Sequence, residues 1–146
     1  MKKIKIVIVL MLFTATIYSQ DKIILINDFI KAVFKEHKAA QFIADHYFYF
    51  EPITDSKVSA TERMKFFEAL LSETKKENSK ILSDLDYQIV GYTDFKGKKI
   101  QFLHEPLDSF IVVQNNKPVL YLSLKEDRIN SFTYVLKGDW AFFLTI

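Results

Sequence analysis

The hydrophobic pattern of this chain changes its main period near Leu85, and that change limits the folds open to it. Before Leu85, apolar residues recur every three or four positions, which is typical of one face of a helix. The spacing predicts a helix over 22–35, a short second helix over 39–46 and a third helix that starts after Ser59. The expected apolar face of the first helix consists of Ile26, Phe29, Ile30, Val33 and Phe34.

The third predicted helix carries its own start signal. Ser59 and Glu62 have the spacing of a capping box, in which each side chain bonds the backbone N–H of the other residue. We expect this helix to fade in the polar run 75–80. Its predicted inner face consists of Met64, Phe67, Leu70, Leu71 and Thr74.

After Leu85 the chain reads as strands separated by turns, and Gly91 indicates a bulge or a bend in the first strand. An aromatic run at 47–50, ended by Pro52, predicts one further short strand between the second and third helices. Helices followed by an antiparallel meander predict an α+β domain, with the sheet curled around the helices. The predicted strands after Leu85 are 87–95, 99–104, 110–114, 119–125, 128–136 and 140–146, with turns at 115–116, 126–127 and 137–139.

The first nineteen residues are predicted to be a targeting segment. A basic start, an apolar run over 6–17 and a return to polar residues are the order of a secretory signal peptide. The run is shorter than the roughly 20 apolar residues of a spanning helix. We predict cleavage after Ser19, a secreted or periplasmic protein with no membrane attachment after cleavage, and a single domain over 20–146. An uncleaved anchor or a buried first helix is the alternative.

Charge and composition exclude several classes of function. The chain has 20 basic and 18 acidic residues, and three of the lysines (Lys2, Lys3 and Lys5) leave with the signal, so 17 basic residues face 18 acidic ones. No basic block remains, which argues against nucleic-acid binding. There is no cysteine, so apolar packing and not disulfides must hold the fold. Three histidines without ligand spacing and three glycines predict no metal and no cofactor.

Three segments of the chain, "NDFIKAVFKEHKAAQFIADHYFYFEP", "SATERMKFFEALL" and "YLSLKEDRINSFTYVL", resemble the opening helices, third helix and late hairpin of the nuclear-transport-factor-2-like superfamily. The resemblance extends over 20–146. It implies helices packed in a cone-shaped antiparallel sheet, similar to the cystatin-like folds. That superfamily includes enzymes, such as ketosteroid isomerases and polyketide cyclases, and many members that bind small molecules or proteins without catalysis.

The resemblance also singles out one carboxylate. In the isomerases a carboxylate directly before a proline on the first strand is the proton-shuttling base, and Glu51-Pro52 resembles that pair. Those enzymes use two acidic donors for the enolate oxygen, a tyrosine on the first helix and a protonated aspartate on a late strand. This chain has Phe29 at the first position and Val119-Leu120 nearest the second. The resemblance therefore implies a base without its oxyanion donors, which usually contribute the larger electrostatic effect.

Two histidines are candidate partners for that base. His46 ends the second predicted helix, and His104 shares a side of its predicted strand with Ile100 and Phe102. Imidazole exchanges protons near neutral pH, so Glu51, His46 and His104 form the candidate catalytic set. The alternative for each histidine is a partly buried, hydrogen-bonded side chain on a core-facing side.

The aromatic residues give the other candidate site. They are predicted to line a cavity for an apolar or ring-shaped ligand, or alternatively to form ordinary core with hydroxyls at its rim. The last strand is apolar on both faces, which favours a homodimer through the sheet. The candidate ligand-binding residues are Tyr47, Tyr49, Tyr92, Tyr134 and Trp140.

From these features we expect a non-catalytic protein that binds a small apolar ligand or a protein partner. A dry, fully filled cone would rule out the ligand. The alternative is a small isomerase, dehydratase or hydrolase that uses Glu51 as its general base.

Overall fold

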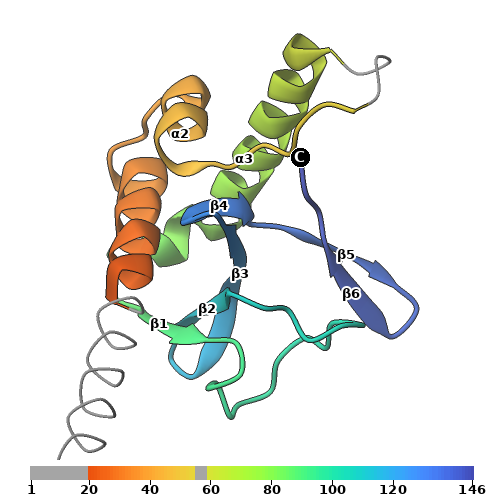
Figure 1. Cartoon of the computed structure of the whole chain (residues 1–146). Coiled ribbons are helices and arrows are strands. Elements are labelled where there is room, and N and C mark those ends of the chain that lie inside the picture. Colours follow the sequence, from red (N-terminus) through yellow and green to blue (C-terminus); the bar gives the residue numbers. More distant parts are fainter. Residues whose placement is uncertain (1–19, 55–58) are drawn as a thin grey trace, which may run out of the picture.

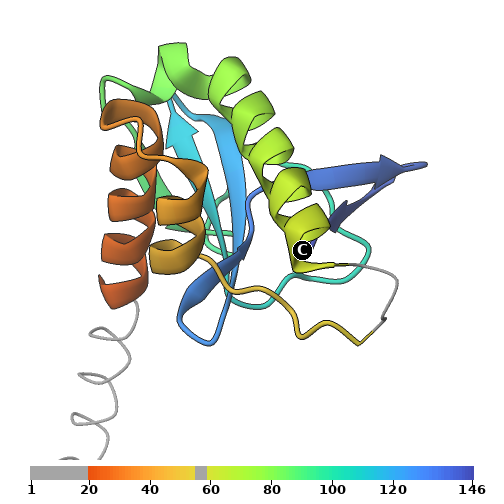
Figure 2. The same cartoon turned by 90° about the horizontal axis from the view of Figure 1, so that it is seen from above.

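The computed structural model describes residues 20–54 and 59–146, so the predicted signal peptide over 1–19 lies outside the described residues. Within the described part, helices come first and antiparallel strands follow (Figure 1), which confirms the predicted α+β class. The helices lie together on one side of the main sheet (Figure 2). This arrangement is compatible with a nuclear-transport-factor-2-like fold.

The three predicted helices are present at the expected places. Residues 20–30 are α-helical and continue into a π-helical turn, η1 (Lys31–Lys35). They are followed by α2 (Ala40–Tyr47) and α3 (Ala60–Leu82). All five residues of the predicted first apolar face are buried, because the 3.6-residue period turns them toward the sheet.

The third helix is longer than predicted. It does not fade in the polar run 75–80 but continues to Leu82. Leu82 is fully buried, and Ile81 packs against the same core, so the last turn is held by tertiary contacts that outweigh its polar composition. The helix therefore reaches far enough to form one wall of the cleft described below.

The predicted capping box is present. The backbone N–H of Glu62 donates to Ser59 Oγ at 3.1 Å, and the backbone N–H of Ser59 donates to Glu62 Oε2 at 2.9 Å. These hydrogen bonds from Ser59 hold the pKa of Glu62 below its ordinary value. The helix start is therefore stabilised by two reciprocal bonds and by a carboxylate at the positive end of the helix dipole.

Replacing Ser59 by alanine is expected to lower the free energy of unfolding by about 1 kcal/mol. Because the folded pKa of Glu62 is lowered, its contribution is present above the unfolded pKa and is lost as pH falls through the folded one. The midpoint temperature of thermal unfolding, measured from about pH 6 to about pH 3, should thus fall further in the wild type than in Ser59→Ala. Ser72→Ala, on the exposed face of the same helix, is the control. An equal fall of the midpoint temperature in the wild type and in Ser59→Ala would contradict the role of the cap.

The strands form two separate antiparallel sheets. A four-stranded sheet has the order β1-β2-β3-β4, and β5 and β6 form a hairpin of their own. The predicted two-residue turns 115–116 and 126–127 are present, with positive φ at all four residues, as turns joining antiparallel neighbours require. The strands are β1 (Gln88–Gly91), β2 (Ser109–Gln114), β3 (Lys117–Lys125), β4 (Arg128–Ser131), β5 (Tyr134–Lys137) and β6 (Trp140–Phe143).

The main sheet is covered on both faces. Val112 and Leu122 belong to the cluster that packs against the helices. Ile111 and Tyr121 belong to a second cluster, with Phe102 and other residues from the segment after β1 and from β6. Strands β2 and β3 are therefore buried on alternate sides, which explains why their sequence is apolar at nearly every position.

Five predicted strands differ from the structure. Strand 87–95 stops at Gly91, where the chain turns and the ladder with β2 has no bulge. Strand 140–146 stops at Phe143. Segment 99–104 is not a strand and contributes only an isolated bridge between Phe102 and Ala141. The aromatic run 47–50 begins as the last turn of α2, and only Phe48 forms a bridge, to Ile129. The predicted strand 128–136 is broken after Ser131. In each place the residues suit a strand, but no neighbouring strand lies alongside over the full length.

The break after Ser131 has a definite cause. The ladder between β3 and β4 ends at the pair Ser123–Ser131. The fully buried hydroxyl of Ser131 lies 2.8 Å from the Thr133 carbonyl and 2.7 Å from the Leu144 carbonyl. Leu144 N–H in turn donates to the Thr133 carbonyl at 3.1 Å. These bonds tie the chain to the segment after β6, so it leaves β3 and enters the separate hairpin.

Candidate functional site

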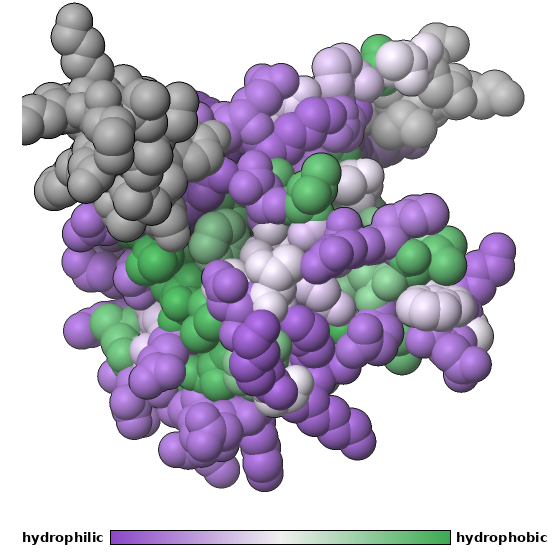
Figure 3. Space-filling view, turned by 60° about the horizontal axis from the view of Figure 1, so that its bottom comes forward, coloured by the Kyte–Doolittle hydropathy of each residue, from purple (hydrophilic) through white to green (hydrophobic). Residues whose placement is uncertain are grey.

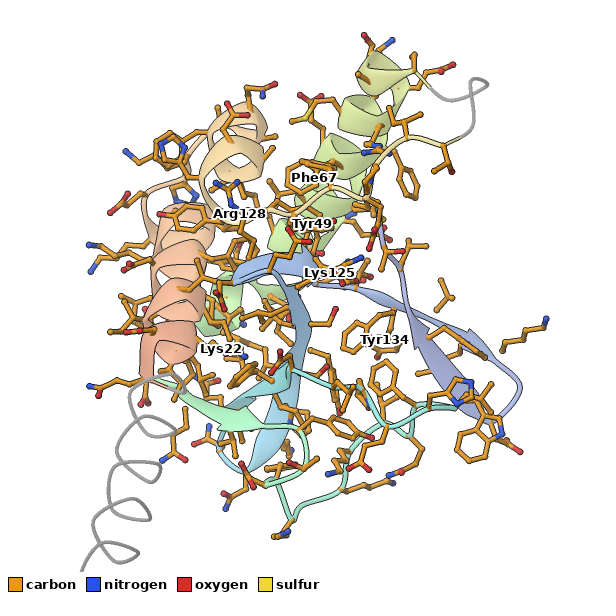
Figure 4. The ribbon with its side chains drawn as sticks, viewed as in Figure 1. Lys22, Tyr49, Phe67, Lys125, Arg128 and Tyr134 are labelled. Atoms are coloured by element: carbon orange, nitrogen blue, oxygen red, sulfur yellow. The ribbon has the colours of Figure 1, made fainter. Side chains whose placement is uncertain are left out.

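A cleft of about 390 Å³ lies where the chain departs from β3. Its walls are α3, segment 98–100, the first half of β3 and residues 132–134. Since β4 pairs only with the far half of β3, no strand occupies this space in the described residues. Figure 4 shows Tyr134 between the hairpin and β3. Residues on these walls include Glu77, Asn78, Lys98, Ile100, Val119, Tyr121, Phe132 and Tyr134.

The space between the helices and the main sheet is filled. Phe48, Phe67 and Phe132 pack there with ring centroids 4.9 to 5.8 Å apart, and Phe29 lies 6.0 Å from Phe132. All four are at most 2 % exposed. A ligand between the helices and the sheet is therefore excluded in this packing, and the cleft lies outside this interior, beside α3.

A series of hydrogen bonds connects the cleft to the segment that follows β1. Tyr92 donates its hydroxyl proton to the Ile100 carbonyl at 2.8 Å, and the Ile100 N–H donates to the Tyr121 hydroxyl at 3.0 Å. The Tyr121 and Tyr134 rings meet edge to face, with centroids 5.6 Å apart. Tyr121 is thereby fixed on the cleft wall by both its ring and its oxygen.

Both tyrosines of the cleft are kept neutral by their surroundings. Burial raises the pKa of Tyr121, and the Ile100 N–H opposes this only in part. Burial also raises the pKa of Tyr134, and the nearby Glu77 carboxylate adds to the effect. Because a phenol ordinarily titrates near about pH 10, both hydroxyls carry their protons at neutral pH. Each can therefore donate a hydrogen bond into the cleft.

The two lysines at the mouth of the cleft differ in whether their ammonium groups have a partner. Lys99 Nζ lies 4.2 Å from the centroid of the Tyr92 ring and donates to the carbonyl oxygens of Phe95 at 3.1 Å and of Tyr92. Its ammonium group is therefore used to hold the loop. Lys98 is exposed and has no hydrogen-bond or ion-pair partner among the described residues, so its ammonium group remains available at the mouth.

Glu51 does not lie in an apolar pocket. Lys125 Nζ lies 2.7 and 2.9 Å from its two carboxylate oxygens, and Asn130 Nδ2 lies 3.4 Å from one of them. Lys125 also lies 5.1 Å from the Tyr49 ring centroid, next to it in Figure 4. The Glu51 carboxylate is therefore paired with a cation that β3 supplies from 74 positions away.

The two candidate histidines lie on other parts of the surface. His46 stacks on Phe42 of the same helix, with ring centroids 3.9 Å apart, and its Nδ1 is 2.9 Å from the Phe42 carbonyl. His104 is exposed in the loop before β2. In the described part of the chain, no hydrogen bond, ion pair or ring contact joins Glu51, His46 and His104 to one another. Their catalytic roles stay predictions.

The five predicted ligand-binding aromatics are not gathered at one place. Tyr134 lines the cleft, and Tyr92 is connected to it through Ile100. Tyr47 packs edge to face on Phe29, and Tyr49 lies under Lys125. Trp140 is 46 % exposed on the hairpin's outer face.

Tyr121 was missed by the sequence analysis. It stands between Leu120 and Leu122, so the strand reads as continuously apolar, and only the alternation of faces along β3 would have set it apart from the helix-facing residues.

The outer face of the hairpin is open in the single chain. Val135 is 48 % exposed there, beside Trp140, while Ala141 on the inner face is buried. Within the described chain alone, the outer side of the last strand is therefore left uncovered. A homodimer through this face stays a prediction.

A second depression, of about 560 Å³, lies beside β1 and the loop before β2, on the face that comes forward in Figure 3. Its lining combines hydrophobic residues such as Ile89 and Phe110 with the carboxylates of Asp94, Glu105 and Asp108. Asp108 pairs with Lys22 Nζ at 2.7 Å. Among the described residues no group of carboxylates and histidines is placed to hold a metal ion. No tyrosine or tryptophan lines this depression, so it suits a ring-shaped ligand less well than the cleft does.

Within residues 20–54 and 59–146, no helix has the length and apolar character needed to cross a membrane. Comparison of the chain with protein-family models, with curated proteins and with solved structures finds no match. Its function is therefore inferred from the residues of the cleft.

Proposed function

We propose that this is an exported, non-catalytic binding protein that holds a small, largely apolar ring-shaped molecule in the cleft between α3 and the β5–β6 hairpin. The observation that carries the proposal is the pair Tyr121 and Tyr134. Their rings meet edge to face on the cleft wall, and neither hydroxyl has a hydrogen-bond acceptor among the described residues. Such a pair offers a ring both apolar contact and orienting donors.

The size and lining of the cleft support a small ligand. A volume of about 390 Å³ lies near the lower end of the range for ligand sites, roughly 300–1,000 Å³. Ile100, Val119 and Phe132 supply apolar surface, and the tyrosine hydroxyls supply a few fixed polar groups. This combination favours binding of a flat apolar body that carries a polar group at one side.

We also propose membership of the nuclear-transport-factor-2-like superfamily, and residence outside the cytoplasm after removal of residues 1–19. The order of three helices before an antiparallel sheet supports the first proposal. The basic start and apolar run of the first nineteen residues support the second.

The enzymatic alternative has less support. A general base must reach the proton it removes, and the two oxygens of Glu51 are instead engaged by Lys125. The acid beside it is the Lys125 ammonium group, whose pKa the hydrogen bond to Glu51 raises, so it gives up its proton less readily. An enzyme that uses Glu51 as its general base therefore stays an alternative, and none of these contacts supports it.

The proposal is tested by native mass spectrometry of the exported protein, purified without denaturation. We expect a bound small molecule in the wild type and at least tenfold lower occupancy in Asn78→Phe. Asn78 lines the cleft, and its amide bonds only to the Thr74 carbonyl of its own helix, so the new ring fills the cleft without breaking a contact between elements. The intact mass also reports whether residues 1–19 have been removed.

The matched control is Lys76→Phe, which adds the same ring on an exposed position of α3. This variant should keep the ligand. Equal occupancy in Asn78→Phe and wild type would move the binding site elsewhere, and a wild type that carries no molecule under these conditions would contradict the proposed function.

A further inference from the structure

Strand β3 has an open edge where it lines the cleft. Successive residues of a strand direct their backbone groups to opposite sides, and the Leu124 N–H donates toward β2, to the Asp108 carbonyl at 2.9 Å. Tyr121 and Ser123 therefore direct their backbone N–H and C=O groups to the other side. On that side β4 pairs with Ser123 and stops there, so its ladder does not reach Tyr121.

The backbone of Tyr121 is consequently left without a neighbouring strand on this side. Among the described residues neither its N–H nor its C=O has a hydrogen-bond partner, although Tyr121 is only 5 % exposed. Backbone groups of buried residues are nearly always paired. The chain that would have paired with them turns into the β5–β6 hairpin after Ser131, and the cleft lies on this open edge.

Two opposite charges also line the cleft, and neither has an ion-pair partner among the described residues. Glu77 is exposed on α3, and Lys98 is exposed on segment 98–100. A short peptide with free ends carries the complementary groups, an ammonium group at one end and a carboxylate at the other. The volume of about 390 Å³ lies in the range of small-ligand sites, which suits a peptide of a few residues and not a folded partner.

We propose that the cleft binds a short peptide with free ends, which lies beside β3 as an added antiparallel strand and exchanges two hydrogen bonds with the backbone of Tyr121. Strand addition at an open sheet edge is a recurring mode of peptide recognition. The apolar wall of Ile100, Val119 and Phe132 takes an apolar side chain of the peptide. The inference goes beyond the proposed function, because it gives the same cleft a second class of ligand through the backbone of β3, independent of the tyrosine hydroxyls.

The test uses a parent peptide, glycyl-leucyl-glycine, and two isomers that differ only in the place of one methyl group. In an added strand the leucine N–H and C=O face Tyr121, and the N–H of the last glycine faces away. N-methylation of the leucine removes the donor to the Tyr121 carbonyl and places a methyl group against it, so the affinity should fall about tenfold. The same methyl group on the last glycine should change the affinity by less than about threefold.

The dissociation constants are measured by amide chemical-shift titration of the exported protein. The Tyr121 amide proton should move downfield with the parent peptide, because its N–H gains an acceptor. Glu77→Gln and Lys98→Gln should each weaken the binding about twofold, as expected for exposed charges, and less at high salt. Glu73→Gln, at an exposed position of the same helix outside the cleft lining, is the control and should bind as the wild type does.

The outcomes separate this inference from the proposed function. Equal affinities of the two isomers, or a parent peptide that leaves the Tyr121 amide unmoved, would overturn strand addition. Unchanged binding in both Glu77→Gln and Lys98→Gln would overturn recognition of the free ends. None of these results alters what native mass spectrometry finds for the ring-shaped molecule, so the two proposals fail or stand on different measurements.

Discussion

Replacing Phe67 by alanine is expected to lower the free energy of unfolding by about 3–5 kcal/mol, which is a large part of the roughly 5–15 kcal/mol of an ordinary domain. Phe67 is fully buried on the inner side of α3 (Figure 4), with its ring 4.9 Å from Phe48, 5.5 Å from Phe50 and 5.8 Å from Phe132. Truncation removes one ring from this set and leaves a cavity that the three remaining rings, which come from two separate segments, cannot easily fill.

The neighbouring residue provides a matched control. Phe66 is 47 % exposed on the same helix, so Phe66→Ala removes the same atoms with a loss of less than about 1 kcal/mol. Urea unfolding of the two variants measures the difference directly. A similar loss in both would mean that the ring cluster is not what holds α3 to the sheet.

The helical part of the fold is predictable because its signals are local. The apolar face that begins with Ile26 and Phe29 needs only the period of the helix, and the Ser59–Glu62 cap is complete within four residues. The turn at 126–127 is likewise set by the residues that it contains. Each of these features forms without information from a distant part of the chain.

The cleft is not predictable in the same way, because distant contacts make it. The hydrogen bond between Tyr121 and Ile100 spans 21 positions, and the one from Ser131 to Leu144 spans 13. The partner of Glu51, Lys125, is 74 positions away. Strand propensity predicts a single strand over 128–136, because no residue inside that segment indicates that its pairing with β3 stops.

Replacing Ser131 by alanine is expected to destabilise the protein by about 1–3 kcal/mol, because two partly buried carbonyl groups, those of Thr133 and Leu144, lose their shared donor, the buried Ser131 hydroxyl. The effect should be concentrated in the β5–β6 hairpin, which the hydroxyl ties to β4. Amide hydrogen exchange should thus accelerate in β5 and β6 by a larger factor than in β2 and β3.

Ser123→Ala is the control, because Ser123 faces Ser131 across the ladder and its buried hydroxyl donates to Asn130 Oδ1, not to the hairpin. It should cost stability without a selective effect on the hairpin. If Ser131→Ala instead accelerates exchange evenly over both sheets, the Leu144 N–H bond to the Thr133 carbonyl is sufficient to hold the bend. In that case the backbone, and not the serine, keeps the cleft open between β3 and the hairpin.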